Sequence, residues 1–291
     1  MRVAITGATG MIGGAIVDAL RARGDEVTVL SRSTNWPAPK EQAPPAEALR
    51  GRDAVVNLLG ENIDQRWRDQ AKAEIRDSRV LGTRNLVAGL AALPEAERPR
   101  VLVSQSGVGY YGARGDEQVT EQEPPGDDFL ARVCAEWEAE ALAASDHGVR
   151  VVIPRTGVVL SPHGGALARM LPFYKAGVGG PIAGGRQYVP WVHHDDLPGA
   201  ILFALDTQTL SGPVNLTAPE PVTNRELGRT LGRVLHRPAV APVPALMMKA
   251  MYGERALFVI TGQRAVPAKL RQAGYPFRHA ELEDALRDVV G

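Results

Sequence analysis

Short apolar runs alternate with segments of helical periodicity along the first 160 residues of the chain. Residues 3–5 form an apolar run that is short enough for a buried strand, and comparable runs lie at residues 26–30 and 53–60. Apolar residues recur at every third or fourth position between Ile12 and Arg23, which predicts a helix there. Alternating strands and helices are typical of a parallel sheet covered by helices.

The same alternation continues after a Pro- and Ala-rich loop at residues 34–48. The pattern predicts helices over residues 67–77, 80–93 and 129–144, and strands over residues 101–104 and 150–154.

Beyond residue 160 the pattern changes, because Gly and Pro cluster between Pro162 and Pro190. We predict helices over residues 165–176, 197–205 and 225–235, a strand over residues 214–216, and a helical tail after Pro242 that Pro and Gly interrupt. Asp195 or Asp196 is a candidate N-cap for the second of these helices, and Thr223-Asn224 for the third.

The predicted fold is therefore α/β, with a Rossmann-type doubly wound parallel sheet and a smaller mixed C-terminal substrate lobe. The sheet domain covers residues 1–160, and residues 190–218 return to it. The smaller lobe is made of residues 161–189 and 219–291.

The turn between the first strand and the first helix reads Thr-Gly-Ala-Thr-Gly-Met-Ile-Gly over residues 6–13. Glycines at positions 7, 10 and 13 of such a turn have separate tasks: one turns the chain, one lets the backbone approach a pyrophosphate, and one lets helix and strand pack closely. The helix N-terminus adds unpaired N–H groups and the positive end of its dipole. We predict a dinucleotide site here, with contacts from Gly7, Thr9, Gly10, Met11 and Ile12.

The residues after the second strand select the cofactor. An acidic residue there would bind the ribose hydroxyls of NAD, but this chain has Ser31-Arg32-Ser33. A guanidinium and two hydroxyls suit a 2′-phosphate, which favours NADP. The alternative is that Arg32 is an ordinary solvated loop residue. Further cofactor contacts are predicted where later strands end, at Leu58, Gly60, Ser104 and Arg155.

Composition narrows the class of protein. Thirty-three basic and 33 acidic residues balance, so no global field draws nucleic acid or an anionic membrane. No apolar run approaches the roughly 20 residues that span a bilayer, and we expect no signal peptide before the first strand. The single Cys134 excludes a disulfide framework and a multi-cysteine metal site. We expect a cytoplasmic protein that acts on a small molecule, and we leave open whether it forms a homo-oligomer.

Several motifs resemble the extended short-chain dehydrogenase/reductase superfamily, in its NAD-dependent epimerase/dehydratase branch. They are the glycine turn, Asn57-Leu-Leu-Gly60, the segment from Ser104 to Gly112, Arg155-Thr156-Gly157 and residues 191–196. The chain also resembles a subgroup described as "epimerase family protein" at Ser78-Arg79, Tyr110-Tyr111-Gly112, Trp137-Glu138, residues 184–187 and residues 262–267. The last of these regions resembles a C-terminal domain of unknown function.

The resemblance implies a Tyr-x-x-x-Lys pair with a nearby Ser or Thr as the catalytic group. No such pair occurs in the chain, and the two corresponding positions hold Leu130 and Cys134, which cannot replace it. Ser106, or its neighbour Ser104, stands where the superfamily keeps its hydroxyl. The alternative interpretation of this serine is a residue at a strand end whose hydroxyl forms a hydrogen bond with the backbone.

Tyr110 and Tyr111 follow Ser106 closely enough to reach the site, although a Tyr beside glycine is more often a packing residue. Tyr110 or a bound water is the candidate proton donor in place of the missing tyrosine. His193 and His194 titrate near neutrality, but as loop histidines they are expected to bond the backbone. We predict no metal site, since neighbouring residues of a strand point to opposite faces.

Arg79 stands where epimerases often have Asn, and it either binds an anionic group of the substrate or forms a local salt bridge. Gln187 and Trp191 are the candidates for lining the substrate site. Two hypotheses follow: an NADP(H)-dependent, epimerase-like oxidoreductase of unknown substrate, or an inactive protein that senses NADP(H) or binds a partner.

Overall fold

The computed structural model describes residues 1–291, which divide into two compact units. The first unit contains residues 1–110, 128–155 and 198–214. The second contains residues 111–127, 156–197 and 215–291. These bounds differ from the predicted ones, since residues 111–127, 156–160, 190–197 and 215–218 group with the second unit.

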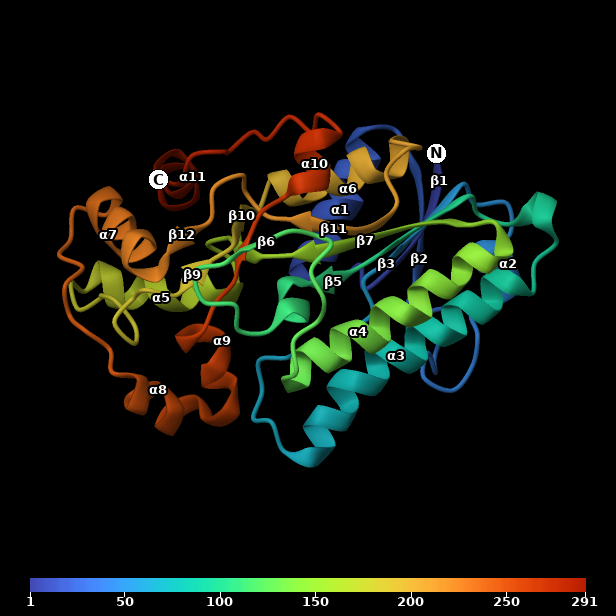
Figure 1. The fold of residues 1–291 in the computed structure, drawn as a ribbon. Coiled ribbons are helices and arrows are strands. Elements are labelled where there is room, and N and C mark those ends of the chain that lie inside the picture. Colours follow the sequence, from blue (N-terminus) through green and yellow to red (C-terminus); the bar gives the residue numbers. More distant parts are fainter. The chain divides into compact units, whose positions relative to one another are not determined.

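The central element of the fold is a seven-stranded sheet with the order β11-β7-β4-β3-β1-β2, in which β5 also pairs with β7 (Figure 1). The pairs β1/β2, β1/β3, β3/β4 and β4/β7 are all parallel, as predicted. The strands are β1 (Arg2–Thr6), β2 (Glu26–Leu30), β3 (Ala54–Asn57), β4 (Val101–Ser104), β5 (Ser106–Gly107), β7 (Arg150–Thr156) and β11 (Gly212–Leu216).

Both faces of this sheet are buried, because neighbouring strand residues such as Val55 and Val56 are each 0 % exposed. On one face, Ala4, Val55 and Leu102 pack with Leu86 and Leu90 of α3 and Ala141 of α4. Helices α3 and α4 lie side by side (Figure 1). The helices of this region are α1 (Met11–Ala22), α2 (Ala46–Leu49), α3 (Asp69–Ala91), α4 (Phe129–Leu142) and α6 (Asp196–Asp206).

The strand order fixes where a ligand belongs. The chain places β2 on one side of β1 and β3 on the other, so the order reverses between β1 and β3. Ligands of open α/β sheets bind outside the carboxyl ends of the strands at such a reversal. The two segments that meet there are the glycine-rich turn after β1 and residues 58–60 after β3.

Two helices predicted over residues 67–77 and 80–93 are one helix, α3. Gly82 lies inside α3, where an added Cβ would lie 3.1 Å from Cδ1 of Leu59. Its glycine therefore permits close packing and does not end the helix. Other boundaries shift by a few residues, and the predicted strand 53–60 is ordered only over Ala54–Asn57.

The second unit has its own apolar core. Leu160, Trp191, Leu227, Leu231 and Leu286 are among its buried members. Its strands are short and form two-stranded pairs: β8 (Val158–Leu160) with β10 (Trp191–His193), β9 (Tyr188–Val189) with β12 (Val222–Thr223), and β6 (Gln118–Val119) with β13 (Arg264–Ala265). Its helices are α5 (Gly165–Lys175), α7 (Asn224–Val234), α8 (Ala245–Tyr252), α9 (Leu257–Ile260), α10 (Ala268–Gln272) and α11 (Leu282–Val290).

Of the two predicted caps, Thr223 accepts a hydrogen bond from the backbone N–H of Glu226 and caps α7. Asp196 is the first residue of α6, and its carboxylate accepts hydrogen bonds from the backbone N–H groups of Arg278 and His279. Asp196 therefore joins the start of α6 to the segment before α11. None of the helices combines the length and the apolar character that crossing a membrane requires.

Candidate functional site

The glycine-rich turn is built as the sequence predicts. Gly7 has a φ of 66°, and a Cβ there would lie 2.6 Å from the carbonyl oxygen of Leu58. A Cβ on Gly13 would lie 2.1 Å from the carbonyl oxygen of Gly7. A Cβ on Gly10 would meet only Gly7 O, at 3.5 Å. Gly7 and Gly13 are therefore required by the fold itself, whereas the space above Gly10 is open.

The N-terminus of α1 faces this open space. Gly10 is its N-cap residue, and the first turn has no side-chain cap and no acidic residue. Thr9, Gly10 and Met11 are exposed, and Ile12 is half-buried. A helix start whose N–H groups lack a cap suits a phosphate.

The end of β2 carries the predicted residues for a 2′-phosphate. Thr6 of β1 and Leu30 of β2 are register partners, so the segment after β2 lies beside the start of the glycine-rich turn. Ser31 Oγ lies 3.1 Å from Ser33 Oγ. Arg32 is exposed and forms no salt bridge, so its guanidinium is available to an anion.

Asn57, at the end of β3, ties the carboxyl ends of three strands together and is 0 % exposed. Its Oδ1 accepts the hydroxyl of Thr6 at 3.0 Å, and its Nδ2 donates to Thr83 Oγ1 at 2.9 Å and to Ser104 Oγ at 3.0 Å. Sequence reasoning missed this role. The available signal was a polar residue inside an otherwise apolar strand.

Ser106, Glu138 and Arg155 form a second buried polar cluster, at the ends of β4 and β7. Ser106 Oγ donates to Glu138 Oε1 at 2.7 Å. Arg155 binds the same carboxylate with two hydrogen bonds, from Nε to Oε1 at 2.9 Å and from Nη2 to Oε2 at 2.7 Å. The three residues are 3 %, 4 % and 2 % exposed. Both charges are therefore paired where water cannot solvate them.

Sequence reasoning singled out Ser106 and Arg155 but not the role of Glu138. The available signal was an acidic residue on the buried face of a helix, since Cys134 and Ala141 of α4 are also buried.

Tyr110 joins this cluster through its ring. The guanidinium carbon of Arg155 lies 3.4 Å from the ring centroid, which is a cation–π contact. Tyr110 lies in a 3-10 turn, Val108–Tyr111, and not on an α-helix. The neighbouring Tyr111 is fully buried, and its hydroxyl donates to Asn215 Oδ1 at 2.6 Å. Tyr111 is therefore a packing residue.

Leu130 and Cys134 lie on α4 and are both buried. Burial raises the pKa of the Cys134 thiol to about 11, and the Glu138 carboxylate acts in the same direction. The thiol is protonated at neutral pH, so Cys134 is not a nucleophile there.

The predicted substrate residues lie in different units. Arg79 is on α3 of the first unit, with its guanidinium against Gly60. Gln187 and Trp191 belong to the second unit. Gln187 Nε2 donates to the carbonyls of Ile182 and Val259. Trp191 is 1 % exposed and donates to the carbonyl of Glu220. Their substrate roles stay predictions.

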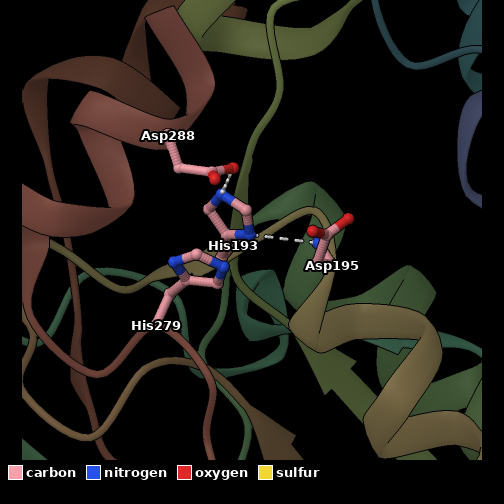
Figure 2. A group of neighbouring side chains, drawn as sticks. All are labelled: His193, Asp195, His279 and Asp288. Atoms are coloured by element: carbon pink, nitrogen blue, oxygen red, sulfur yellow. Dashed lines mark hydrogen bonds and ion pairs between the residues drawn. The ribbon is translucent and has the colours of Figure 1, made fainter. Parts of the chain in front are cut away.

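His193 of β10 is the centre of a separate cluster with Asp195, His279 and Asp288 (Figure 2). The potential ligand atoms lie within 4.8 Å of one another, and these residue types can bind a metal ion. Only one of the two ring nitrogens makes a hydrogen bond, since the buried Nε2 has no hydrogen-bond partner. Nδ1 accepts the backbone N–H of Asp195 at 3.2 Å, so the neutral ring carries its proton on Nε2, which lies 3.2 Å from Asp288 Oδ2.

The charge state of His193 fits this arrangement. Burial lowers its pKa to about 4, and the neighbouring His279 and His194 act in the same direction. The rings of His193 and His279 are stacked, with centroids 3.6 Å apart. The neutral His193 therefore joins β10 to α11 in the second unit.

Comparison with known proteins shows the family to which the chain belongs. A model of the NAD dependent epimerase/dehydratase family matches residues 3–216. The chain belongs to this family. A second model, a domain of unknown function (DUF1731), matches residues 243–289. Both matches confirm the resemblance read from the sequence, including its C-terminal part.

Relatives of this epimerase family chain cover nearly its whole length. The human epimerase family protein SDR39U1 is 38 % identical over 295 residues, which cover 100 % of both chains. The Bacillus subtilis epimerase family protein YfhF is 35 % identical over 300 residues, covering 100 % of this chain and 98 % of the relative. An Arabidopsis thaliana relative named as chloroplastic is 41 % identical over 302 residues, with 100 % and 87 % covered. The cytoplasmic location stays a prediction.

Solved structures confirm the Rossmann-like fold. The crystal structure of human SDR39U1 (isoform 2) with NADPH matches with a TM-score of 0.91 at 36 % identity and covers 99 % of each chain. A nucleoside-diphosphate sugar epimerase from Corynebacterium glutamicum matches with a TM-score of 0.80 at 35 % identity, over 100 % of this chain and 58 % of that one.

Proposed function

We propose that this chain is an NADP(H)-dependent, epimerase-like oxidoreductase that acts on a small molecule and uses Ser106 and Glu138 in place of the usual Tyr-x-x-x-Lys pair. One observation carries the proposal: an open dinucleotide cradle and a buried Ser–Glu–Arg cluster both lie at the ends of strands of the same sheet.

The cofactor half of the proposal rests on three features. The space above Gly10 is free of side chains, the start of α1 has no cap, and Arg32 is exposed and unpaired. The first two suit a pyrophosphate, and the third suits the 2′-phosphate that distinguishes NADP from NAD. The human relative that was crystallised with NADPH supports the same cofactor.

NADP(H), when bound, supplies hydride transfer at its nicotinamide ring. The chain's own residues move the proton. Because the hydroxyl of Ser106 donates to Glu138, a lone pair of its oxygen is left to accept a proton from a substrate hydroxyl. The Ser106 proton then passes to the Glu138 carboxylate, and the reverse transfer returns a proton to a carbonyl oxygen.

Arg155 acts as a positioning residue in this scheme. Its two hydrogen bonds hold the carboxylate of Glu138 in position. The same guanidinium covers one face of the Tyr110 ring, which places Tyr110 beside the cluster. Tyr110 is a second candidate for contact with the substrate carbonyl.

Turnover of a panel of hydroxyl and carbonyl compounds, including nucleotide sugars, with NADP⁺ or NADPH tests the proposal. Ser106→Ala is expected to lower kcat by about 10²–10⁴-fold, the usual contribution of a proton-transfer group, and to leave NADPH affinity unchanged. Glu138→Gln is expected to have a similar effect, and Glu140→Gln, a half-buried residue of the same helix that pairs with Arg84, is its control.

The second candidate function is an inactive NADP(H) sensor or partner-binding protein. It is favoured by the buried Leu130 and Cys134, which occupy the places of the missing pair. A saturated protein that turns over nothing in the panel, with Ser106→Ala indistinguishable from the original, would support the sensor and contradict the enzyme. A sensor should also bind NADPH and NADP⁺ with different affinities.

A further inference from the structure

Arg79 is a half-buried cation without a carboxylate partner. It lies on α3, where its Nη1 donates to the backbone carbonyl of Ile75 at 2.9 Å. Its guanidinium carbon lies 5.3 Å from the ring of Trp137 on α4. Burial lowers the pKa of Arg79, and it forms no salt bridge.

The neighbouring arginines of the same helix show how unusual this is. Arg76 pairs with Glu136, and Arg84 pairs with Glu140. The side chains of Arg76 and Arg84 are 43 % and 56 % exposed, so water already solvates them. Arg79, whose pKa is lowered by burial, is thus the one of these three arginines without a counter-ion, although a buried charge is normally paired.

The nearby acidic groups do not supply the missing charge. The thiol of Cys134 would have to be deprotonated, but its pKa of about 11 keeps it neutral at neutral pH. Glu61 is near enough to act on the pKa of Arg79 but forms no ion pair with it. No carboxylate of the chain therefore forms an ion pair with the Arg79 guanidinium, although Glu61 acts on its pKa.

Gly60 makes room for this guanidinium. A Cβ on Gly60 would lie 2.8 Å from Nη2 of Arg79 and 2.9 Å from its Cζ. Gly60 follows Leu58, whose carbonyl lies against Gly7 of the dinucleotide turn. Arg79 consequently lies beside the point where the strand order reverses, between β1 and β3.

We propose that Arg79, seated against Gly60, binds the oxygens of an anionic group, either a phosphate or a carboxylate. The planar guanidinium suits two oxygens of such a group. The anion comes either from the diphosphate of the cofactor or from the substrate. If the anion belongs to the substrate, the substrate is an anionic compound. Only this assignment to the substrate rests on the proposed function.

Calorimetric titration of the full chain separates the two sources. If the anion belongs to the cofactor, Arg79→Gln raises the Kd of NADPH about tenfold or more. If it belongs to the substrate, the Kd of NADPH is unchanged. The NADPH-saturated protein then binds inorganic phosphate or malonate, and Arg79→Gln abolishes that binding. Arg84→Gln, on the exposed face of the same helix, is the matched control and should change neither titration.

Gly60→Ala provides a second variant. The three atoms nearest to its Cβ all belong to the flexible end of the Arg79 side chain, so the fold should survive while the guanidinium moves. We expect the same direction of change as in Arg79→Gln. Thermal melting adds a readout that a purely structural role would not give: removing an unpaired buried charge should keep or raise Tm.

Titrating phosphate and malonate into the protein without NADPH keeps this inference distinct from the proposed function. A chain that fails to bind NADPH contradicts the proposed function, whereas Arg79-dependent binding of either probe still supports the inference. Equal NADPH, phosphate and malonate titrations for Arg79→Gln and the original chain would overturn it.

Discussion

Single buried polar residues carry much of the organisation around the candidate site. Asn57 is the clearest case, because its amide satisfies hydroxyl groups from two strands and one helix. Buried polar groups are tolerated only when they are hydrogen-bonded. Removing one partner leaves the other groups buried without a hydrogen bond.

Asn57→Ala should therefore destabilise the protein by about 1–3 kcal/mol, since Thr6, Thr83 and Ser104 each lose a partner. Chemical denaturation measures this change in the free energy of unfolding. Asn62→Ala, at an exposed position, is the control and should stay within about 0.5 kcal/mol. An equal loss in both variants would contradict the role given to Asn57.

His193 predicts a dependence of stability on pH. Its pKa is about 4 in the folded chain and about 6.5 when unfolded. Between these values the unfolded chain binds more protons, so the free energy of unfolding falls as the pH falls from about 6.5 to 4, by up to about 1.4 kcal/mol per pH unit. Urea titrations of the original chain and His193→Gln at several pH values measure this.

The advantage of the original chain over His193→Gln should shrink through that range and then stay constant. The exposed His163→Gln is the control. A difference between His193→Gln and the original chain that does not depend on pH would show that His193 is not held neutral.

At the scale of elements, different glycines of the glycine-rich turn serve folding and cofactor binding. Gly13→Ala would place a Cβ 2.1 Å from a backbone oxygen, so it should destabilise the fold. Gly10→Ala meets nothing closer than 3.5 Å and has a φ of −76°, which alanine adopts freely. We expect Gly10→Ala to keep the Tm and to weaken NADPH binding about tenfold or more, because its methyl group occupies the approach of the pyrophosphate. Unchanged NADPH affinity in Gly10→Ala would contradict this use of the turn.

Elements that local patterns define were predicted well. The apolar runs of β1, β2 and β4, and the glycine spacing of the turn, are each encoded within a few neighbouring residues. The break predicted between residues 77 and 80 was wrong, because α3 is one helix over Asp69–Ala91. Gly82 lies inside this helix, where it permits close contact with Leu59.

The polar clusters could not be predicted because their members are distant in sequence. Ser106 and Arg155 meet Glu138 only when α4 lies against the ends of β4 and β7, so no spacing rule reveals the cluster. The same holds for Arg79. From the sequence, Arg79 either binds an anionic group of the substrate or forms a local salt bridge. The structure shows no salt bridge for Arg79.

At the scale of the whole molecule, every predicted cofactor residue, from Gly7 to Arg155, belongs to the first unit. Binding of NADPH to the folded chain alone should raise its stability by RT ln(1 + [L]/Kd), which is about 2.7 kcal/mol at a ligand concentration of 100 Kd. A thermal melt with increasing NADPH checks this, with NADH at the same concentrations as its control. A Tm that does not respond to NADPH would contradict binding to the folded state.

The most direct test of the account is the affinity of the full chain and of Arg32→Ala for NADPH and NADH, measured by calorimetry. The open turn at Gly10 and the exposed, unpaired Arg32 predict that the original chain binds NADPH about tenfold or more tightly than NADH, and that Arg32→Ala loses this preference. No heat with either nucleotide, or an equal affinity for both in the original chain, would contradict it.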